Sequence, residues 1–191
     1  MASFTPPMPK ERNLFLSAQV NQQSMLDLTK HIIEINEDDN KLKKIYKLFN
    51  FKYKPQPIKI MIDSYGGSVY QCFGLLSIMS ASKTPIHTYV TGCAMSCGFM
   101  IAITGHKRFA YEMATLLYHQ VSSGTRGKLK EMEEVIIETK RLHKMIEEHT
   151  LKNTKITKAR LKESYVAKED WHIPVKEALK LGIIDEIVSR L

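Results

Sequence analysis

The sequence predicts an α/β domain with a largely parallel sheet. Short apolar runs alternate with segments whose apolar residues recur at helical spacing. Two of these runs lead into small, glycine-containing turns just before a helical segment. Strands that alternate with helices are joined by right-handed crossovers, which leave neighbouring strands parallel. The 191 residues are enough for a single domain with a hydrophobic core.

The first two thirds of the chain contain most of the expected elements. The segments read as strands, from their short apolar runs, are residues 13–20, 58–62, 86–90, 108–111 and 116–121. The segments read as helices, from their spacing, are residues 24–35, 69–80 and 96–104. The last of these helices is followed by Gly105, a typical helix-ending residue.

The last third is dominated by a helical pattern over residues 128–152, with charged residues on its second face. One uninterrupted helix of that size would be about 37 Å long, more than a small domain needs to cover its sheet. It either projects to pack on another subunit or breaks near its middle. Shorter helices are expected at residues 158–164 and 174–181, followed by a final apolar segment at residues 183–188.

Composition limits the class of protein. Apolar residues make up 43% and charged residues 25% of the chain, as in globular proteins generally. There is no apolar run long enough to span a membrane, and the first residues lack a signal-peptide core, so we expect a cytoplasmic protein. Three cysteines do not suggest a disulfide framework. The net charge of +8 favours acidic partners in a general way.

Residues 41–54 look like an insertion into this single domain of residues 1–191. The segment holds six lysines interleaved with four aromatic residues. Basic and aromatic interleaving is typical of platforms for single-stranded nucleic acid. The other interpretation is an amphipathic extension whose aromatic side chains pack on the domain or on a neighbour. We favour the second and expect no nucleic-acid partner, because no recognised nucleic-acid motif surrounds the segment.

Ser96 stands in the segment GCAMSCG, between an expected strand and an expected helix. A sharp turn there would lift a serine hydroxyl out of the sheet, next to free backbone N–H groups that can stabilise an oxyanion. A serine in this place is also a common helix N-cap. The segment by itself leaves both roles open.

Two further features gain meaning beside Ser96. The pair Gly66–Gly67 follows another strand, and its backbone N–H groups could face a ligand or simply form a tight turn. Turns at the same end of a parallel sheet face a common crevice, which favours the ligand-binding role for both. His119 ends an apolar run and is either a core histidine or a base for Ser96.

Taken together, these segments resemble the proteolytic subunit of Clp protease. The matching segments are RNLFLSAQV, IDSYGG, TGCAMSCGF, YHQV and KEALKLGIIDEIV, which extend from about Arg12 to the C-terminus. The resemblance implies the ClpP/crotonase-like fold, a ββα superhelix with a largely parallel sheet. It also implies that the long helix of the last third projects to a neighbouring subunit.

The resemblance assigns roles to individual residues. Ser96 would be the nucleophile, His119 the general base and Asp170 the group that orients the base. The backbone N–H groups of Gly67 and Cys97 would form the oxyanion hole. No cofactor and no metal are implied. Cys97 is a poor rival as nucleophile, because a side chain one residue along a helix points about 100° away from its neighbour.

The implied activity is cleavage of polypeptides inside stacked heptameric rings. An AAA+ unfoldase would be the partner that supplies ATP hydrolysis, since the chain lacks the GxxxxGK[ST] motif. Two alternatives are a non-catalytic ring subunit and a crotonase-like enzyme that handles acyl-CoA. The latter would share the fold and the oxyanion hole but would not need the three catalytic side chains.

Overall fold

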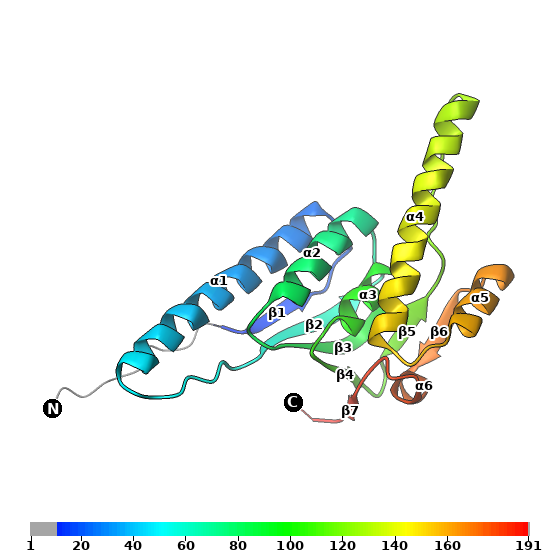
Figure 1. Ribbon diagram of the computed structural model, residues 1–191. Helices are drawn as coiled ribbons and strands as arrows, with labels where there is room; N and C mark the ends of the chain where they lie inside the picture. The colour runs from blue at the N-terminus through cyan, green and yellow to red at the C-terminus, as the bar shows by residue number, and fades with distance from the viewer. Residues whose placement is uncertain (1–10, 191) are drawn as a thin grey trace.

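The computed structural model describes residues 11–190, which form a twisted sheet with helices packed on one of its faces (Figure 1). The strands are β1 (Asn13–Leu16), β2 (Ile58–Ser64), β3 (Ile86–Met95), β4 (Lys107–Tyr111), β5 (Thr115–Tyr118), β6 (Trp171–Pro174) and β7 (Glu186–Val188). The helices are α1 (Gln22–Leu48), α2 (Val69–Ala81), α3 (Cys97–Ile103), α4 (Leu129–Asn153), α5 (Lys158–Ala167) and α6 (Val175–Lys180).

The sheet has the order β1-β2-β3-β4-β7, and every one of these neighbours is parallel. The long strand β3 has two partners in succession. Its first part pairs with β4, and its last residues pair with β5, which in turn pairs antiparallel with β6. The predicted parallel sheet is confirmed. The antiparallel strand β6 was not predicted, because it is a short segment that starts at the lone tryptophan.

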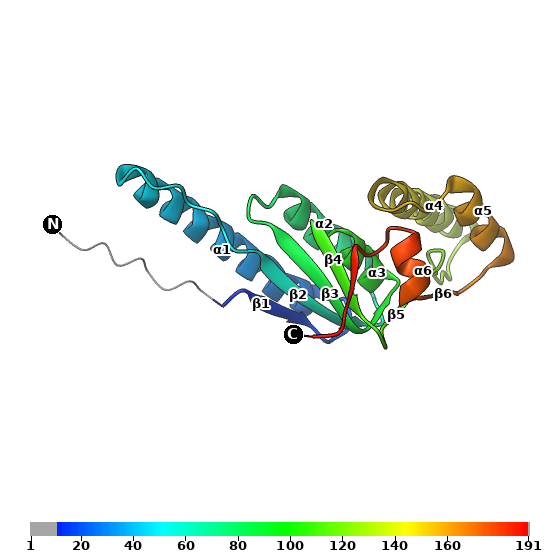
Figure 2. The same cartoon turned by 90° about the horizontal axis from the view of Figure 1, so that it is seen from below.

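The helices cover the sheet unevenly. Seen from below, α1, α2 and α3 lie along one face, while α4 and α5 lie beyond the sheet at its β5–β6 end (Figure 2). Burial in β2 alternates accordingly, with Ile58, Ile60 and Ile62 fully buried and Lys59 exposed. A fully buried side chain of this size contributes about 1.5–3 kcal/mol, so this alternation fixes which face of the strand meets the helices.

Helix α1 begins with a capping box. The Asn21 side chain accepts from the Ser24 backbone N–H at 3.0 Å, and the Ser24 hydroxyl accepts from the Asn21 N–H at 3.1 Å. The residues that α1 buries recur at helical spacing: Met25, Leu28, Ile32, Ile35 and Asp39. The expected end of this helix at Ile35 was wrong, because it continues to Leu48. The first part of the basic segment 41–54 is therefore helical.

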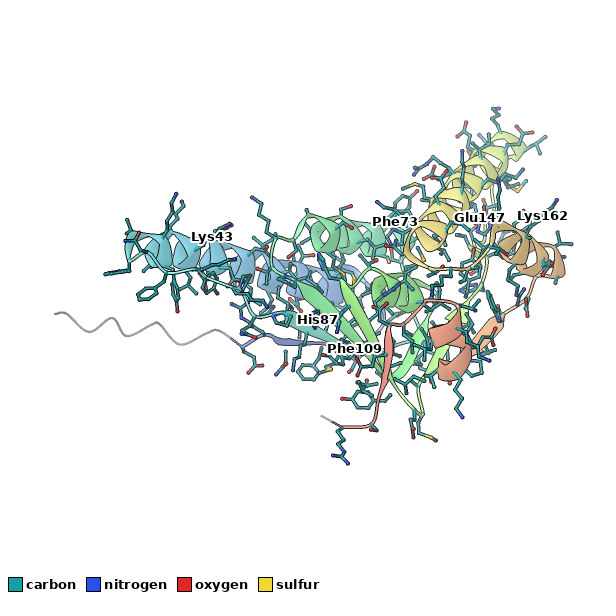
Figure 3. All side chains as sticks on the ribbon, turned by 60° about the horizontal axis from the view of Figure 1, so that its bottom comes forward. Lys43, Phe73, His87, Phe109, Glu147 and Lys162 are labelled. Carbon is teal, nitrogen blue, oxygen red and sulfur yellow. The ribbon has the colours of Figure 1, made fainter. Side chains whose placement is uncertain are left out.

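A buried polar cluster ties the far end of α1 to the domain. Asp39 accepts two hydrogen bonds from the Arg12 guanidinium, at 2.6 and 3.0 Å. It also accepts from the hydroxyls of Tyr53 and Thr84, each at 2.5 Å. Burial would raise the pKa of Asp39, but these donors hold it below its ordinary value. Beyond this cluster α1 projects past the sheet, with Lys43 on the projecting part (Figure 3).

The predicted long helix is confirmed as α4, which has 25 residues without a break. Only its C-terminal part packs on the domain, through Leu142, Ile146 and Thr150. Its N-terminal part stands away from the sheet, and Leu129 and Ile137 there are 71% and 66% exposed (Figure 1). Among residues 11–190, no helix is long and apolar enough to cross a membrane.

Candidate active site

Ser96 occupies the tight turn between β3 and α3. Its backbone has φ of 54° and ψ of −119°, a conformation that non-glycine residues rarely adopt. The Ser96 N–H donates to the Leu117 carbonyl at 3.0 Å, which fastens the turn to β5. Ser96 occupies the N-cap position of α3, as one of the two interpretations expected, but its side chain makes no capping hydrogen bond. A strained strand-to-helix turn that carries a serine is typical of a nucleophile, and here the Ser96 side chain also interacts with the Cys97 side chain.

The Gly66–Gly67 turn packs directly against this serine turn. Gly66 has φ of 93°, and a Cβ atom there would lie 2.6 Å from the Met95 carbonyl oxygen and 2.8 Å from the Ser96 Cβ. Only glycine allows this approach. The close packing explains why two loops that are about thirty residues apart in sequence form one site.

The segment between β1 and α1 holds the glycine turn from its other side. The Val20 N–H donates to the Gly66 carbonyl, and the Ser68 N–H donates to the Val20 carbonyl, both at 2.8 Å. The buried Ser64 hydroxyl donates to the Ala18 carbonyl at 2.6 Å and accepts from the Gly66 N–H at 3.2 Å. None of these hydrogen bonds uses the Gly67 N–H.

The backbone N–H groups of two residues near Ser96 donate to no backbone acceptor within residues 11–190. They belong to Gly67 and to Cys97, the first residue of α3. Gly67 lines the same cavity as Ser96. Paired N–H groups beside an activated hydroxyl are the arrangement that stabilises a tetrahedral oxyanion.

The positions of His119 and Asp170 depend on the pairing of β5 with β6. The antiparallel ladder ends at the pair of Tyr118 with Trp171, and one further step in the same register would place His119 opposite Asp170. His119 is half-buried and Asp170 is exposed. Sequence reasoning without the family resemblance had no signal for Asp170, because its place depends on the unpredicted strand β6.

A small cavity joins the serine and the histidine. It holds about 50 Å³ and is lined by Ser96, His119 and Gly67 together with apolar groups that include Met100 and Ile146. Asp170 is not among its lining residues. Within the described residues, no hydrogen bond joins the Ser96 hydroxyl to the His119 ring, or the ring to the Asp170 carboxylate. Ser96 and His119 therefore share this cavity without a hydrogen bond between their side chains, and Asp170 lies outside its lining.

Arg160 fixes both neighbours of Asp170. Its guanidinium donates to the Glu169 carboxylate at 2.8 Å and lies 3.8 Å from the centre of the Trp171 ring. The hydrogen bond from Arg160 lowers the pKa of Glu169, so that carboxylate stays charged and paired. Sequence reasoning missed Arg160, Ser64 and Val20, since all three act through neighbours and belong to no catalytic motif.

The described residues contain no candidate metal site. No group of three histidine, cysteine, aspartate or glutamate side chains among them could hold a metal ion. The groups that the structure brings to the cavity include the Ser96 hydroxyl, the His119 imidazole and the backbone of Gly67.

Comparison with known proteins matches this chain to one family over almost its whole length. The family model described as Clp protease matches residues 3–190. The ATP-dependent Clp protease proteolytic subunit of Streptococcus mutans is 29% identical over 189 residues, which cover 94% of this chain and 86% of that protein. The corresponding subunit of Deinococcus radiodurans is 29% identical over 137 residues, covering 71% of this chain and 66% of that protein.

Comparison with solved structures points to the same family of folds. A point mutant of ClpP1 from Listeria monocytogenes superimposes with a TM-score of 0.77 at 21% identity, covering 94% of this chain and 92% of the other. That likeness confirms the predicted ClpP-like α/β fold. The turn at Ser96, the glycine turn packed on it and the match over residues 3–190 agree, and the chain belongs to the Clp protease family.

Proposed function

We propose that this chain is a serine endopeptidase whose nucleophile is Ser96, with His119 as general base and Asp170 as the group that orients the base. The observation that carries the proposal is the meeting of three segments at one cavity. The serine turn, the end of β5 and the glycine turn all contribute to its lining. The β5–β6 register supports Asp170 as the third member.

The chemistry follows the arrangement of these groups. His119 takes the Ser96 proton as the hydroxyl oxygen attacks the peptide carbonyl, and Asp170 stabilises the imidazolium that forms. The N–H groups of Gly67 and Cys97 hold the oxyanion, and one such donor is typically worth about 10²–10³ in kcat. His119 then protonates the leaving amine, and water attacks the acyl-enzyme in the second half of the cycle.

The three side chains have to come together before this chemistry starts. Catalytic hydrogen bonds are often long in the resting enzyme and tighten when substrate binds. Asp170 has the room to move, because its side chain is exposed. Contacts with neighbouring subunits are a natural source of that adjustment, since the N-terminal part of α4 stands off the domain with apolar side chains exposed.

We further propose that copies of this chain assemble into stacked heptameric rings that enclose the active sites, and that an AAA+ unfoldase delivers polypeptide substrates. The exposed apolar part of α4 supports contacts between copies. The sheet face without helices supports a docking partner, because it carries Phe109 (Figure 3). Tyr89 stacks on Phe109 at 4.5 Å, and Phe15, in the same row of the sheet, is 67% exposed. Three free cysteines fit a reducing compartment such as the cytoplasm.

Hydrolysis of unstructured peptides tests the catalytic proposal. Replacement of Ser96 or His119 by alanine should lower kcat by about 10⁶, and Asp170→Ala by about 10⁴, because the three groups act as a unit. Each variant should keep the far-UV and near-UV circular dichroism of the parent. Unchanged hydrolysis by Ser96→Ala would remove the serine from the mechanism.

The two alternative functions predict different results in these assays. A non-catalytic subunit would assemble without cleaving any peptide by itself. A crotonase-like enzyme would bind acyl-CoA and would be insensitive to Asp170→Ala. Sedimentation should show a particle far larger than the 21.9 kDa chain, and a fully active monomer would contradict the ring proposal.

A further inference from the structure

Two of the three cysteines meet behind the serine turn. Cys72 lies on α2 and Cys97 is the first residue of α3; they are 0% and 2% exposed. The Cys72 thiol donates to the Cys97 carbonyl oxygen at 3.6 Å. The Cys97 thiol donates to the Gly67 carbonyl oxygen at 3.3 Å. Sulfur atoms therefore connect α2, the serine turn and the glycine turn in series.

This series reaches both residues that supply the oxyanion donors. The Cys97 side chain holds the carbonyl of Gly67, and its own backbone N–H is the second donor. Thiols are weak hydrogen-bond donors, so the link can be broken by a modest chemical change at sulfur. Any reaction that removes the Cys97 hydrogen also removes the bond to Gly67.

The two thiols differ in their readiness to ionise. A separate hydrogen bond between the two side chains lowers the pKa of Cys97 and raises the pKa of Cys72, and burial raises the pKa of Cys72 further. Cys97 is therefore the thiol that reacts first, and Cys72 is the neighbour that can complete the reaction. Gly67, which accepts from the Cys97 thiol, lines the cavity at Ser96, and this cavity is the route by which we expect hydrogen peroxide to approach the sulfur.

We propose that Cys72 and Cys97 are a site of oxidative modification, at which hydrogen peroxide forms a disulfide that disables the oxyanion hole. The consequence for activity rests on the proposed peptidase function, while the disulfide itself does not. The Cys72 thiol meets the backbone of Cys97, and the two side chains interact, although 25 residues separate them in the sequence and no motif indicates the pairing.

The reaction balances without any further component. The Cys97 thiolate attacks one oxygen of hydrogen peroxide and the O–O bond breaks. Hydroxide departs, and Cys97 becomes a sulfenic acid. The Cys72 sulfur then attacks the sulfenic sulfur, the S–O bond breaks, and the thiol proton leaves with the oxygen as water. In sum, two thiols are oxidised by two electrons and one peroxide is reduced to two waters. A dithiol reductant reverses the change by exchange.

The disulfide changes the site in two ways. Cys97 no longer has a hydrogen to donate to Gly67, so the glycine turn loses one of its restraints. The new bond also draws the first residue of α3 toward α2, and the Cys97 N–H moves with it. Misplacing one oxyanion donor is worth about 10²–10³ in kcat, so we expect peptide hydrolysis to fall about 100-fold.

The third cysteine provides a matched control. Cys93 is also buried, at 9% exposure, but its neighbour is the Asp63 carboxylate, and its N–H donates to Asp63 at 3.0 Å. Cys93 belongs to the same chain as Cys72 and Cys97, is also buried, and is exposed to the same reagent. Cys93→Ser should therefore remain as sensitive to peroxide as the parent.

The experiment treats the full-length assembled protein with hydrogen peroxide, maps its peptides without reduction, and measures peptide hydrolysis in parallel. We expect the peptides that contain Cys72 and Cys97 to be joined with the loss of two hydrogens. Hydrolysis should fall about 100-fold and should return with dithiothreitol. Cys72→Ser should keep the basal rate and become resistant, and Cys72→Ala serves if the serine variant does not fold.

The outcomes separate the two proposals. Thiols that stay alkylatable in the unfolded protein after peroxide treatment would overturn the inference, as would a complete disulfide with full hydrolysis. If no preparation hydrolyses peptides but the disulfide still forms, the modification site stands and the proposed peptidase function fails.

Discussion

Replacing Gly66 by alanine is the sharpest structural test of how the site is built. The added Cβ would lie 2.6 Å from the Met95 carbonyl oxygen and 2.9 Å from the Cys97 nitrogen. To restore an ordinary contact of about 3.4 Å, the serine turn has to retreat by roughly 0.8 Å from the glycine turn. The positive φ of 93° adds a further ~1–2 kcal/mol for any residue with a Cβ.

Both consequences can be measured separately. A displacement of about 1 Å at a reacting centre can lower a rate 10²-fold, so peptide hydrolysis by Gly66→Ala should fall at least that far. Chemical denaturation should show a loss of stability of about 2–4 kcal/mol, from the strained backbone and the clash together. The assays are denaturant titration and steady-state hydrolysis of a fluorogenic peptide.

Gly74 provides the matched control for this substitution. It lies within α2, and a Cβ there would meet no atom within 4 Å. Gly74→Ala should therefore raise stability by about 0.5–1 kcal/mol and leave hydrolysis unchanged. The reasoning is refuted if Gly66→Ala is as stable and as active as Gly74→Ala, because the two turns would then not be in the contact described.

Three other predictions follow from the contacts. Asp39→Asn should lower the free energy of unfolding by about 3 kcal/mol at neutral pH, because Arg12 loses its charged partner. The folded pKa of Asp39 is depressed, so the stability it contributes is present above pH 4 and is lost as the pH falls through that lower value. Denaturant titrations from pH 7 to pH 2.5 should accordingly give a flatter profile for the variant, and parallel profiles would contradict the assignment. Ser64→Ala should lower kcat about tenfold with KM nearly unchanged, since the Gly66 N–H loses its acceptor. Thr88→Val, which removes an equally buried hydroxyl bound to a distant carbonyl, should affect only stability, and equal effects of the two on kcat would refute the positioning role. Ile137→Lys should leave the chain folded but reduce the assembled fraction in sedimentation, whereas an unchanged particle would place the contact between copies elsewhere.

Much of the fold was predictable because apolar periodicity records burial directly. The buried positions of α1 up to Ile35 and the strand at residues 58–62 could be read from the sequence, and the structure confirms them. The end of α1 could not, because the residue that continues the buried seam is Asp39. A carboxylate normally marks a solvent-facing position, and only the long-range contact with Arg12 makes its burial favourable.

The candidate site was likewise only partly predictable from the sequence. Ser96 and the glycine turn were recognisable because tight strand-to-helix turns need small residues at fixed places. Asp170 depended on the family resemblance, since its position opposite His119 arises from a strand of four residues with no periodic signal. The contact between Cys72 and Cys97 is a product of how α2 packs on α3, which no local pattern specifies.

Labelling with a fluorophosphonate probe, followed by peptide mass mapping, tests the central claim most directly. The account predicts stoichiometric labelling at Ser96 in the assembled protein and its loss in His119→Ala, because the hydroxyl reacts only when the imidazole removes its proton. Labelling at another residue, or equal labelling of Ser96 in His119→Ala, would contradict the account.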